Sequence, residues 1–368
     1  MKKGVVLIIS IFLIALALLG ILKGNLKTQT SNPEVVVSSG PEEKRITIVA
    51  VGTLLYNMPI VWGAYNGSSY DFRPIFEDVK KEIEGADFAI ADLEATINPK
   101  KKLSGYPRYN SPIEILDGIK YAGFDVLNLA NNHIMDNGLE GLLYTRKAIE
   151  DYGMIPLGAG DKGQEKHVIL EKNGIRIGLL SYTYGTNGIP APDGTVNFID
   201  KEKIKKDIEE IRKDCDFLIV YLHTGTEYVR NIEPYQYELF RWVADLGADA
   251  VLGNHPHVYR DSEIYETGGR KVFINYSLGN FISNQNDKYT DIGLMVRLTV
   301  LKRNSVTKIE KAEVIPVYRL RYREGGKTVY KVVFCSRIDD YKIPESQKSY
   351  VLEVYNDILK KNDFSGQF

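Results

Sequence analysis

Four of the five histidines in this 368-residue chain lie where apolar, strand-like segments run into polar loops. They are His133 in LANNHIMDNG, His223 in YLHTGTEY, and His255 and His257 in GNHPHV. Residues i and i+2 of an extended segment point the same way, so His255 and His257 are expected to face one metal ion or one anion. A single histidine is more often an ordinary surface or core residue. Four in similar positions favour metal binding, because imidazole is a common metal ligand.

Carboxylate and amide side chains follow two further strand-like segments. ADLEAT places Asp92 and Glu94 on one face of a strand end, and ANNH places Asn132 beside His133. An amide oxygen can bind a metal, and His133 could act as a general acid or contact a phosphate. The alternatives are a solvated strand edge for the first segment and an ordinary turn for the second. Nitrogen and oxygen ligands without thiolates suit Mn, Zn, Fe or Mg, and two adjacent ions could hold a phosphoryl group and activate water.

Other kinds of site have weaker support. Cys215 has no histidine near it in sequence that would activate a thiol. The chain has no G-x-S-x-G elbow, no P-loop and no G-x-G-x-x-G after a strand, which argues against nucleotide-driven ligation. Cys215 and Cys335 are the only cysteines, so a disulfide scaffold is excluded, and whether the two pair is open. A formal net charge of −1 lacks the basic footprint of a nucleic-acid binder.

Alternating strands and helices must position these side chains. Apolar runs predict strands at 46–52, 87–94, 125–133, 216–223, 248–255 and 271–281, and a β-rich pair at 291–318. Asn173-Gly174 predicts a hairpin turn within 167–183. Helices are predicted at 76–85, 113–123, 138–152, 201–213, 233–247 and 345–361. This alternation predicts an α/β layered fold, with the polar clusters at the carboxyl ends of strands, where such folds bind ligands.

The N-terminal segment is predicted to be a membrane anchor. The 19 residues from Gly4 to Leu22 carry no charge and are long enough to span a bilayer as a helix. The alternative is a cleaved signal, which would leave the protein secreted. Lysines at the N-terminus favour a cytoplasmic N-terminus and a single-pass protein in the cell membrane, with the domain outside. Residues 1–28 are therefore predicted to form the anchor or signal and 29–45 a linker.

Five segments resemble, in order and spacing, the motifs of the CapA family of capsule-synthesis proteins linked to poly-γ-glutamate. They are DLEATI, LANNHIMDNG, YLHTGTEY, GNHPHV and YSLGNF. The match covers roughly 46–320, which leaves 321–368 as a C-terminal extension with a helix. The resemblance implies an α/β fold, a layered metallophosphoesterase-like β-sandwich flanked by helices and preceded by one N-terminal transmembrane helix.

The resemblance also implies roles for individual residues. His133 would be the catalytic acid or phosphate-contacting group, and the metal ligands would be Glu94, Asn132, His223, His255 and His257. Two positions depart from the related pattern. Thr53 stands where the first strand of the family normally ends in Gly-Asp, and Asn254 stands where related phosphoesterases often carry histidine. Threonine is a poor ligand compared with a carboxylate, so one metal position is expected to be weakened or absent.

The resemblance implies a membrane-anchored extracellular protein of capsule or poly-γ-glutamate biosynthesis or export. The expected partners are other membrane components of polymer synthesis and an anionic polymer or phosphoester substrate, with no nucleic acid. Two alternatives stay open: a metal-dependent phosphoesterase that uses metal-activated water, and a catalytically degenerate scaffold subunit. Arg319, Arg321 and Arg323 alternate in YRLRYRE and would line one face of a strand. They could form a basic patch for the polymer or protect an edge strand by its charge.

Overall fold

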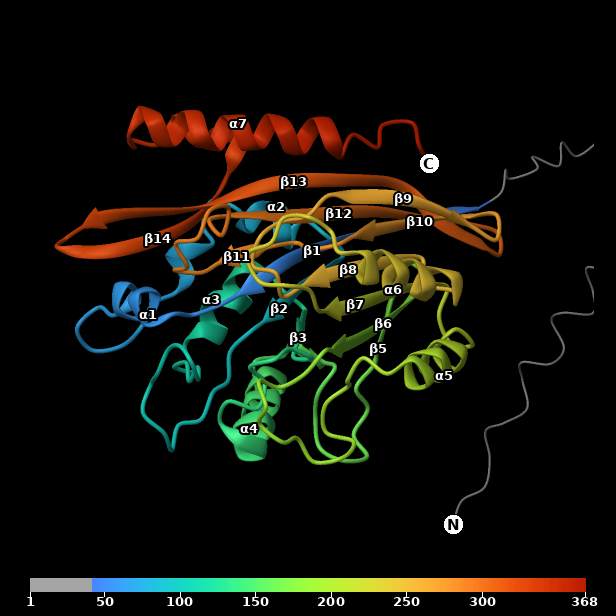
Figure 1. Cartoon of the computed structure of the whole chain (residues 1–368), viewed down its shortest axis with the longest axis horizontal. Coiled ribbons are helices and arrows are strands. Elements are labelled where there is room, and N and C mark those ends of the chain that lie inside the picture. Colours follow the sequence, from blue (N-terminus) through green and yellow to red (C-terminus); the bar gives the residue numbers. More distant parts are fainter. Residues whose placement is uncertain (1–41) are drawn as a thin grey trace, which may run out of the picture. The chain divides into compact units, whose positions relative to one another are not determined.

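Two β-sheets pack face to face in the computed structural model, which describes residues 42–368 (Figure 1). The strands of the first sheet are β1 (Glu43–Leu54), β2 (Phe88–Leu93), β3 (Val126–Asn128), β4 (Ile155–Leu157), β11 (Asn280–Ile282), β12 (Ile292–Arg303), β13 (Val306–Glu324) and β14 (Lys327–Phe334). Their order is β14-β13-β12-β1-β2-β3-β4, with β11 beside β1. The second sheet contains β5 (Val168–Lys172), β6 (Ile175–Thr183), β7 (Phe217–His223), β8 (Ala250–Asn254), β9 (Ser262–Thr267) and β10 (Arg270–Asn275). Its order is β5-β6-β7-β8-β10-β9.

Helices cover the outer faces of both sheets. The first sheet packs against α1 (Met58–Ala64), α2 (Lys80–Glu84), α3 (Ile115–Ala122) and α4 (Gly138–Asp151). The second packs against α5 (Lys201–Ile211) and α6 (Pro234–Asp245). The C-terminal helix α7 (Glu345–Lys361) runs along β13 (Figure 1). The predicted α/β fold is confirmed, with the two sheets forming the inner layers.

The apolar runs of the sequence follow from this layering. In β1, Val49 and Val51 join the core under the helices, while Ile48 and Ala50 join the core between the sheets. A strand buried on both faces reads as a continuous apolar run rather than an alternating one.

Parallel strands bring their carboxyl ends to a common edge. β1 to β4 run parallel in the first sheet, and β6, β7, β8 and β10 run parallel in the second. The chain crosses between the sheets at this edge, because β10 ends at Asn275 and β11 begins at Asn280 beside β1. A Cβ on Gly52 would lie 1.9 Å from the carbonyl oxygen of Gly279, so glycine at 52 is required for this close approach.

Several sequence predictions need correction. The predicted strand 271–281 is two strands in different sheets, and the predicted helix 76–85 is only the short α2, preceded by a 3-10 turn at Arg73–Ile75. The hairpin is confirmed, because Asn173 and Gly174 both have positive φ, at 54° and 70°. α1, β4, β9 and β14 were not predicted.

The predicted domain boundaries fall inside strands. β1 begins at Glu43, within the predicted linker 29–45, and β13 runs across the boundary placed after residue 320. The anchor predicted for 1–28 lies outside the described residues. Within 42–368, no helix combines the length and apolar character needed to cross a bilayer. Cys215 and Cys335 are free thiols, each buried in a different hydrophobic core.

Candidate metal centre

Glu94, directly after β2, is a fully buried carboxylate, and neither of its oxygens has a hydrogen-bond partner. Three imidazoles surround it. The Nε2 atoms of His133 and His223 each lie 3.8 Å from Oε1, and Nδ1 of His257 lies 3.9 Å from Oε2. Burial, followed by the charge of Asp92, raises the pKa of Glu94 well above its usual range. An unpaired buried charge is costly, so this carboxylate fits a bound cation.

Glu94, His223 and His255 form a group that could hold a metal ion. One ligand atom from each lies within 4.8 Å of the others. Ligands on opposite sides of one ion are at most about 4.4 Å apart when each bond is about 2.2 Å, so only small side-chain movements are needed. Burial lowers the pKa of His255 far below its ordinary value. His255 is therefore neutral, as a metal ligand must be.

Asn132 adds an amide oxygen to this group. Its Oδ1 lies 2.9 Å from Nε2 of His223, and its Nδ2 donates to Oδ1 of Asn187 at 3.2 Å. The hydrogen bond to Asn187 turns the amide so that its oxygen faces the metal-binding group. The four donors come from both sheets, because Glu94 and Asn132 follow β2 and β3 while His223 ends β7 and His255 follows β8.

His133 is held by a carboxylate of its own loop. Its Nδ1 lies 2.8 Å from Oδ2 of Asp136, which also accepts a hydrogen bond from the backbone N–H of Tyr109 at 2.7 Å. The carboxylate favours the proton on Nδ1. The opposite nitrogen, Nε2, therefore faces Glu94 with a free lone pair.

His257 lies on the other side of Glu94 from His223. Its Nδ1 is 3.0 Å from Oδ1 of Asn280, and burial lowers its pKa to about 3. The prediction that His255 and His257 belong to an extended segment is wrong, because their φ angles are 98° and 58°. Their rings are nevertheless only 6.1 Å apart, because consecutive tight turns after β8 direct both toward Glu94.

Thr53, at the end of β1, is buried and binds another side chain rather than providing a carboxylate. Its hydroxyl donates to Oδ2 of Asp92 at 3.2 Å, and Nδ2 of Asn128 donates to Oδ1 of Asp92 at 2.7 Å. Nδ1 of His223 also lies 3.2 Å from Oδ2 of Asp92, without hydrogen-bond geometry. Asp92 is thus occupied by neighbours on both oxygens. The carboxylate that faces His257 is that of Glu94.

The structure brings the other five predicted site residues together around Glu94, and the role of each of the six stays a prediction. Sequence reasoning missed residues that orient them. Asp136 and Asn280 lie inside recognised motifs, so their positions in those motifs were a usable signal. Tyr228 also lies inside a recognised motif, YLHTGTEY, and had the same signal. Tyr184 had no such signal, because it reaches the site only through folding. The rings of Tyr184 and Tyr228 lie 4.6 Å from that of His255 and 6.0 Å from that of His257, and both are partly exposed at the entrance.

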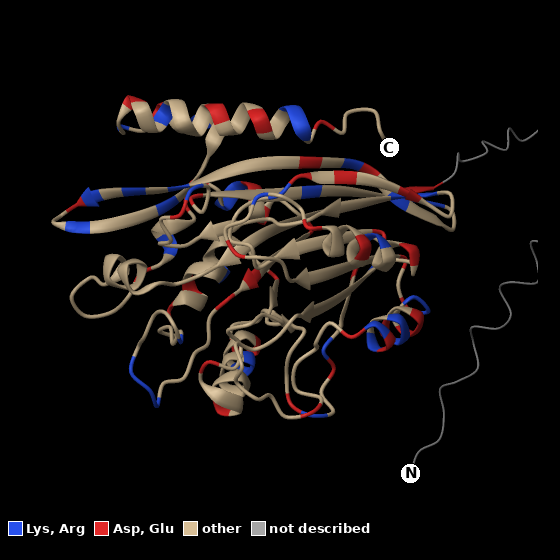
Figure 2. Cartoon of the chain, in the orientation of Figure 1, with Lys and Arg blue, Asp and Glu red and all other residues tan. Residues whose placement is uncertain are grey.

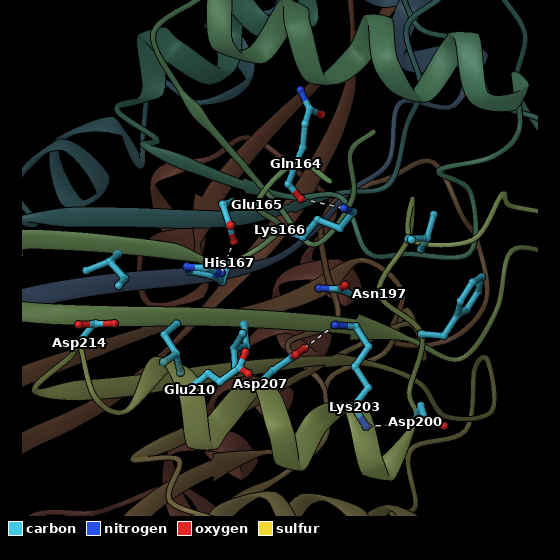
Figure 3. A pocket seen from close by; sticks show the side chains of 16 residues that line it. Gln164, Glu165, Lys166, His167, Asn197, Asp200, Lys203, Asp207, Glu210 and Asp214 are labelled. Atoms are coloured by element: carbon cyan, nitrogen blue, oxygen red, sulfur yellow. Dashed lines mark hydrogen bonds and ion pairs between the residues drawn. The ribbon is translucent and has the colours of Figure 1, made fainter. Parts of the chain in front are cut away.

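The fifth histidine, His167, lies elsewhere. It lines a cavity of about 670 Å³ between β5 and α5, where its Nδ1 lies 3.0 Å from Oε2 of Glu165 (Figure 3). Lys203 and Asp207 form an ion pair at 2.7 Å in the same cavity. None of its lining side chains carries a buried polar atom without a partner, so this cavity lacks the feature that marks Glu94.

Comparisons with known proteins agree with the motifs. The family model described as bacterial capsule synthesis protein PGA_cap matches residues 47–285. The PGA biosynthesis protein CapA of Bacillus subtilis is 31% identical over 290 residues, covering 73% of this chain and 74% of that protein. The capsule biosynthesis protein CapA of Bacillus anthracis is 30% identical over 266 residues, covering 66% of this chain. The matched region spans 61% of the length of that relative.

Solved structures with a similar arrangement have low sequence identity. A phosphatase from Mycoplasma pneumoniae has a TM-score of 0.48 and 14% identity, covering 75% of this chain and 95% of that one. The calcineurin-like phosphoesterase YfkN from Bacillus subtilis has a TM-score of 0.43 and 13% identity, covering 86% and 98%. The family model and the two CapA relatives establish that the chain belongs to the bacterial capsule synthesis protein PGA_cap family.

Proposed function

We propose that this protein acts in the biosynthesis or export of a poly-γ-glutamate capsule, as a membrane-anchored domain outside the cell that binds one divalent cation. The proposed ligands are Glu94, Asn132, His223 and His255. The observation that carries the metal site is the buried carboxylate of Glu94, which has no hydrogen-bond partner and is surrounded by imidazoles. Family membership supports the link to the polymer.

A bound divalent cation supplies a positive charge that attracts and polarises an anionic oxygen. The side chains around it have separate tasks. Asp136 holds the proton on Nδ1 of His133, so Nε2 can accept a proton beside Glu94 and later return it. Tyr184 and Tyr228 flank the entrance, where they limit access of water and bulky groups to the histidines.

The position of the protein in the cell is part of the same proposal. The uncharged segment Gly4–Leu22 would anchor it in the cell membrane with the N-terminus inside, or direct secretion if it is cleaved. Its partners would then be other membrane components of polymer synthesis and the anionic polymer itself.

Metal analysis of the full chain, purified in detergent, tests the cation site. We expect one Mn or Zn per chain after loading and dialysis, and less than a tenth of that for His223→Ala. His167→Ala is the matched control, since this histidine lines a separate cavity, and it should retain the ion. Wild-type protein that binds no divalent cation would refute the site.

The proposed role in polymer biosynthesis or export is tested in a bacterial host that makes poly-γ-glutamate. Deletion of the gene should reduce surface polyglutamate, and the wild-type chain should restore it where His223→Ala does not. Unchanged polymer after deletion would refute the biological part of the proposal.

A metal-dependent phosphoesterase is the second candidate. It is favoured by His133, whose Nε2 faces the metal group while Asp136 supports Nδ1. Turnover of generic phosphoesters with Mn or Zn, abolished in His133→Ala, would support it. The third candidate, a non-catalytic scaffold, is favoured by Thr53, which binds Asp92 in place of a second ion. A wild-type chain without turnover that still restores polymer would support the scaffold.

A further inference from the structure

Strand β13 carries arginine at three alternate positions, 319, 321 and 323, which we call the arginine row. Alternate residues of a strand point to the same face. The row lies in the outer half of the hairpin of β13 and β14, where Figure 2 shows a concentration of Lys and Arg. The pairing of β13 with β12 ends at Tyr318, so along the row β13 pairs with β14 alone. This part of β13 is therefore an edge, as the sequence-based alternative of a charged edge strand predicted.

The arginine row has no acidic partners in the part of the chain that the structure describes. Arg319 donates to the backbone oxygen of Gln285 at 3.0 Å, and Arg321 donates to Oδ1 of Asn286 at 2.9 Å. Arg323 donates to the backbone oxygen of Gly326 at 2.9 Å. All three acceptors are neutral. Elsewhere arginines do meet carboxylates: Arg45 pairs with Glu310, Arg212 with Asp249, Arg241 with Glu263 and Arg297 with Glu82.

Arg319 is the most constrained member of the row. It is only 5% exposed, and its Nε has no hydrogen-bond partner. Burial lowers its pKa, and the charge of Asp291 offsets this only in part. Asp291 is itself bound by the hydroxyl of Tyr350 at 2.9 Å. A buried cation without a paired anion is unfavourable, so Arg319 can gain from an arriving carboxylate.

One residue connects the arginine row to the metal centre. Gln285 accepts the hydrogen bond from Arg319 through its backbone, while its side chain accepts from Asn280 at 2.8 Å and donates to Tyr228 at 3.1 Å. Asn280 in turn lies 3.0 Å from His257. The loop that contains Gln285 therefore contacts both the first arginine of the row and Tyr228 at the entrance of the metal centre.

The spacing of the row fits a particular polymer. Alternate residues of a strand are about 6.6 Å apart, at about 3.3 Å per residue. An ordinary residue has three backbone bonds and spans at most about 3.6 Å, so a γ-linked glutamate with five would span about 6 Å when extended. Each γ-linked unit carries one free carboxylate. The rise of one extended polymer unit is therefore close to the spacing of the arginines.

We infer that the arginine row binds successive carboxylates of γ-linked polyglutamate and guides the polymer toward the metal centre. This inference rests on the proposed function, because the polymer is identified as poly-γ-glutamate only through the family to which the chain belongs. The negative charges of Glu227 and Asp287 lie close enough to Tyr228 to raise its pKa, and they would repel a polyanion at the entrance. The arginine row would provide the attraction that overcomes this repulsion. Guanidinium groups suit this task, because they bind carboxylates through two parallel hydrogen bonds.

Binding of purified poly-γ-glutamate to the full chain in detergent tests the inference, with affinity measured from 50 to about 300 mM salt because screening weakens exposed ion pairs. The double variant Arg321→Glu/Arg323→Glu changes exposed side chains and should weaken binding about tenfold or more, since two attractive contacts become repulsive. The matched control Lys147→Glu/Lys206→Glu makes the same change in net charge on α4 and α5, and should bind within about twofold of wild type. Hyaluronan, whose carboxylates are further apart, should bind more weakly than polyglutamate.

The outcomes separate this inference from the proposed function. If wild type binds the polymer and one metal ion, but the arginine variant binds equally well, the arginine row is refuted and the proposed function stands. Equal weakening by the lysine control would also refute the row, because net charge alone would explain the effect. If wild type binds neither polymer nor metal, the proposed function is refuted, and the inference that rests on it is refuted with it. Retained metal in the arginine variant shows that its fold is intact.

Discussion

Replacing Thr53 with aspartate tests the single-cation centre most directly. The Thr53 hydroxyl lies 3.2 Å from Oδ2 of Asp92 in a buried environment. A carboxylate introduced there would lie about 4 Å from that of Asp92, and their repulsion is about 4 kcal/mol at an effective dielectric constant of about 20. With an unfolding entropy of about 2.1 cal/mol/K per residue, this lowers the Tm of the metal-free chain by about 6 °C.

Divalent cations should reverse this loss. The new carboxylate, Glu94 and His257 would together provide ligands for a second ion on the side of Glu94 that faces His257. The metal content should therefore rise from one ion per chain to two. At a metal concentration a hundred times the dissociation constant, binding of the second ion would restore about 2.7 kcal/mol.

The assay is thermal unfolding with a chelator and with excess Mn, together with elemental analysis. Thr53→Val is the matched control, because it removes the hydrogen bond without adding charge. It should cost about 1–3 kcal/mol and leave the metal content at one. Two ions in the wild-type chain, or a Thr53→Asp variant as stable as wild type in chelator, would refute the reasoning.

Three further predictions concern other parts of the molecule. Asp136→Asn should leave the metal content at one but reduce any phosphoester turnover about 10–100-fold, because it loosens His133 without removing a proposed ligand; steady-state kinetics would check this. Cys215 and Cys335 should not react with Ellman's reagent until the chain unfolds, since burial raises the pKa of both thiols; rapid labelling of the native protein would contradict this. Ile358→Ala should lower the free energy of unfolding by about 2–5 kcal/mol because Ile358 lies on the buried face of α7, whereas Leu359→Ala, at a partly exposed position of the same helix, should cost less than half as much in denaturant titrations.

Local patterns in the sequence were enough to predict the layers and the candidate ligands. β1 and β7 are buried on both faces, so each reads as an apolar run that could be recognised without its partners. The turn at Asn173-Gly174 depends only on the φ angles that these two residues tolerate. Histidines that follow such strands were therefore placed correctly at the carboxyl edge.

Relations between distant segments could not be predicted in this way. β10 and β11 read as one strand, because nothing local shows that the chain changes sheets between Asn275 and Asn280. The pairing of Thr53 with Asp92, and of Asn132 with Asn187, joins residues that lie 39 and 55 positions apart. Periodicity reports only which face a side chain takes within its own element, whereas sheet order and loop packing decide which side chains meet. The number of cations that the centre can hold therefore depends on the folded arrangement around Glu94.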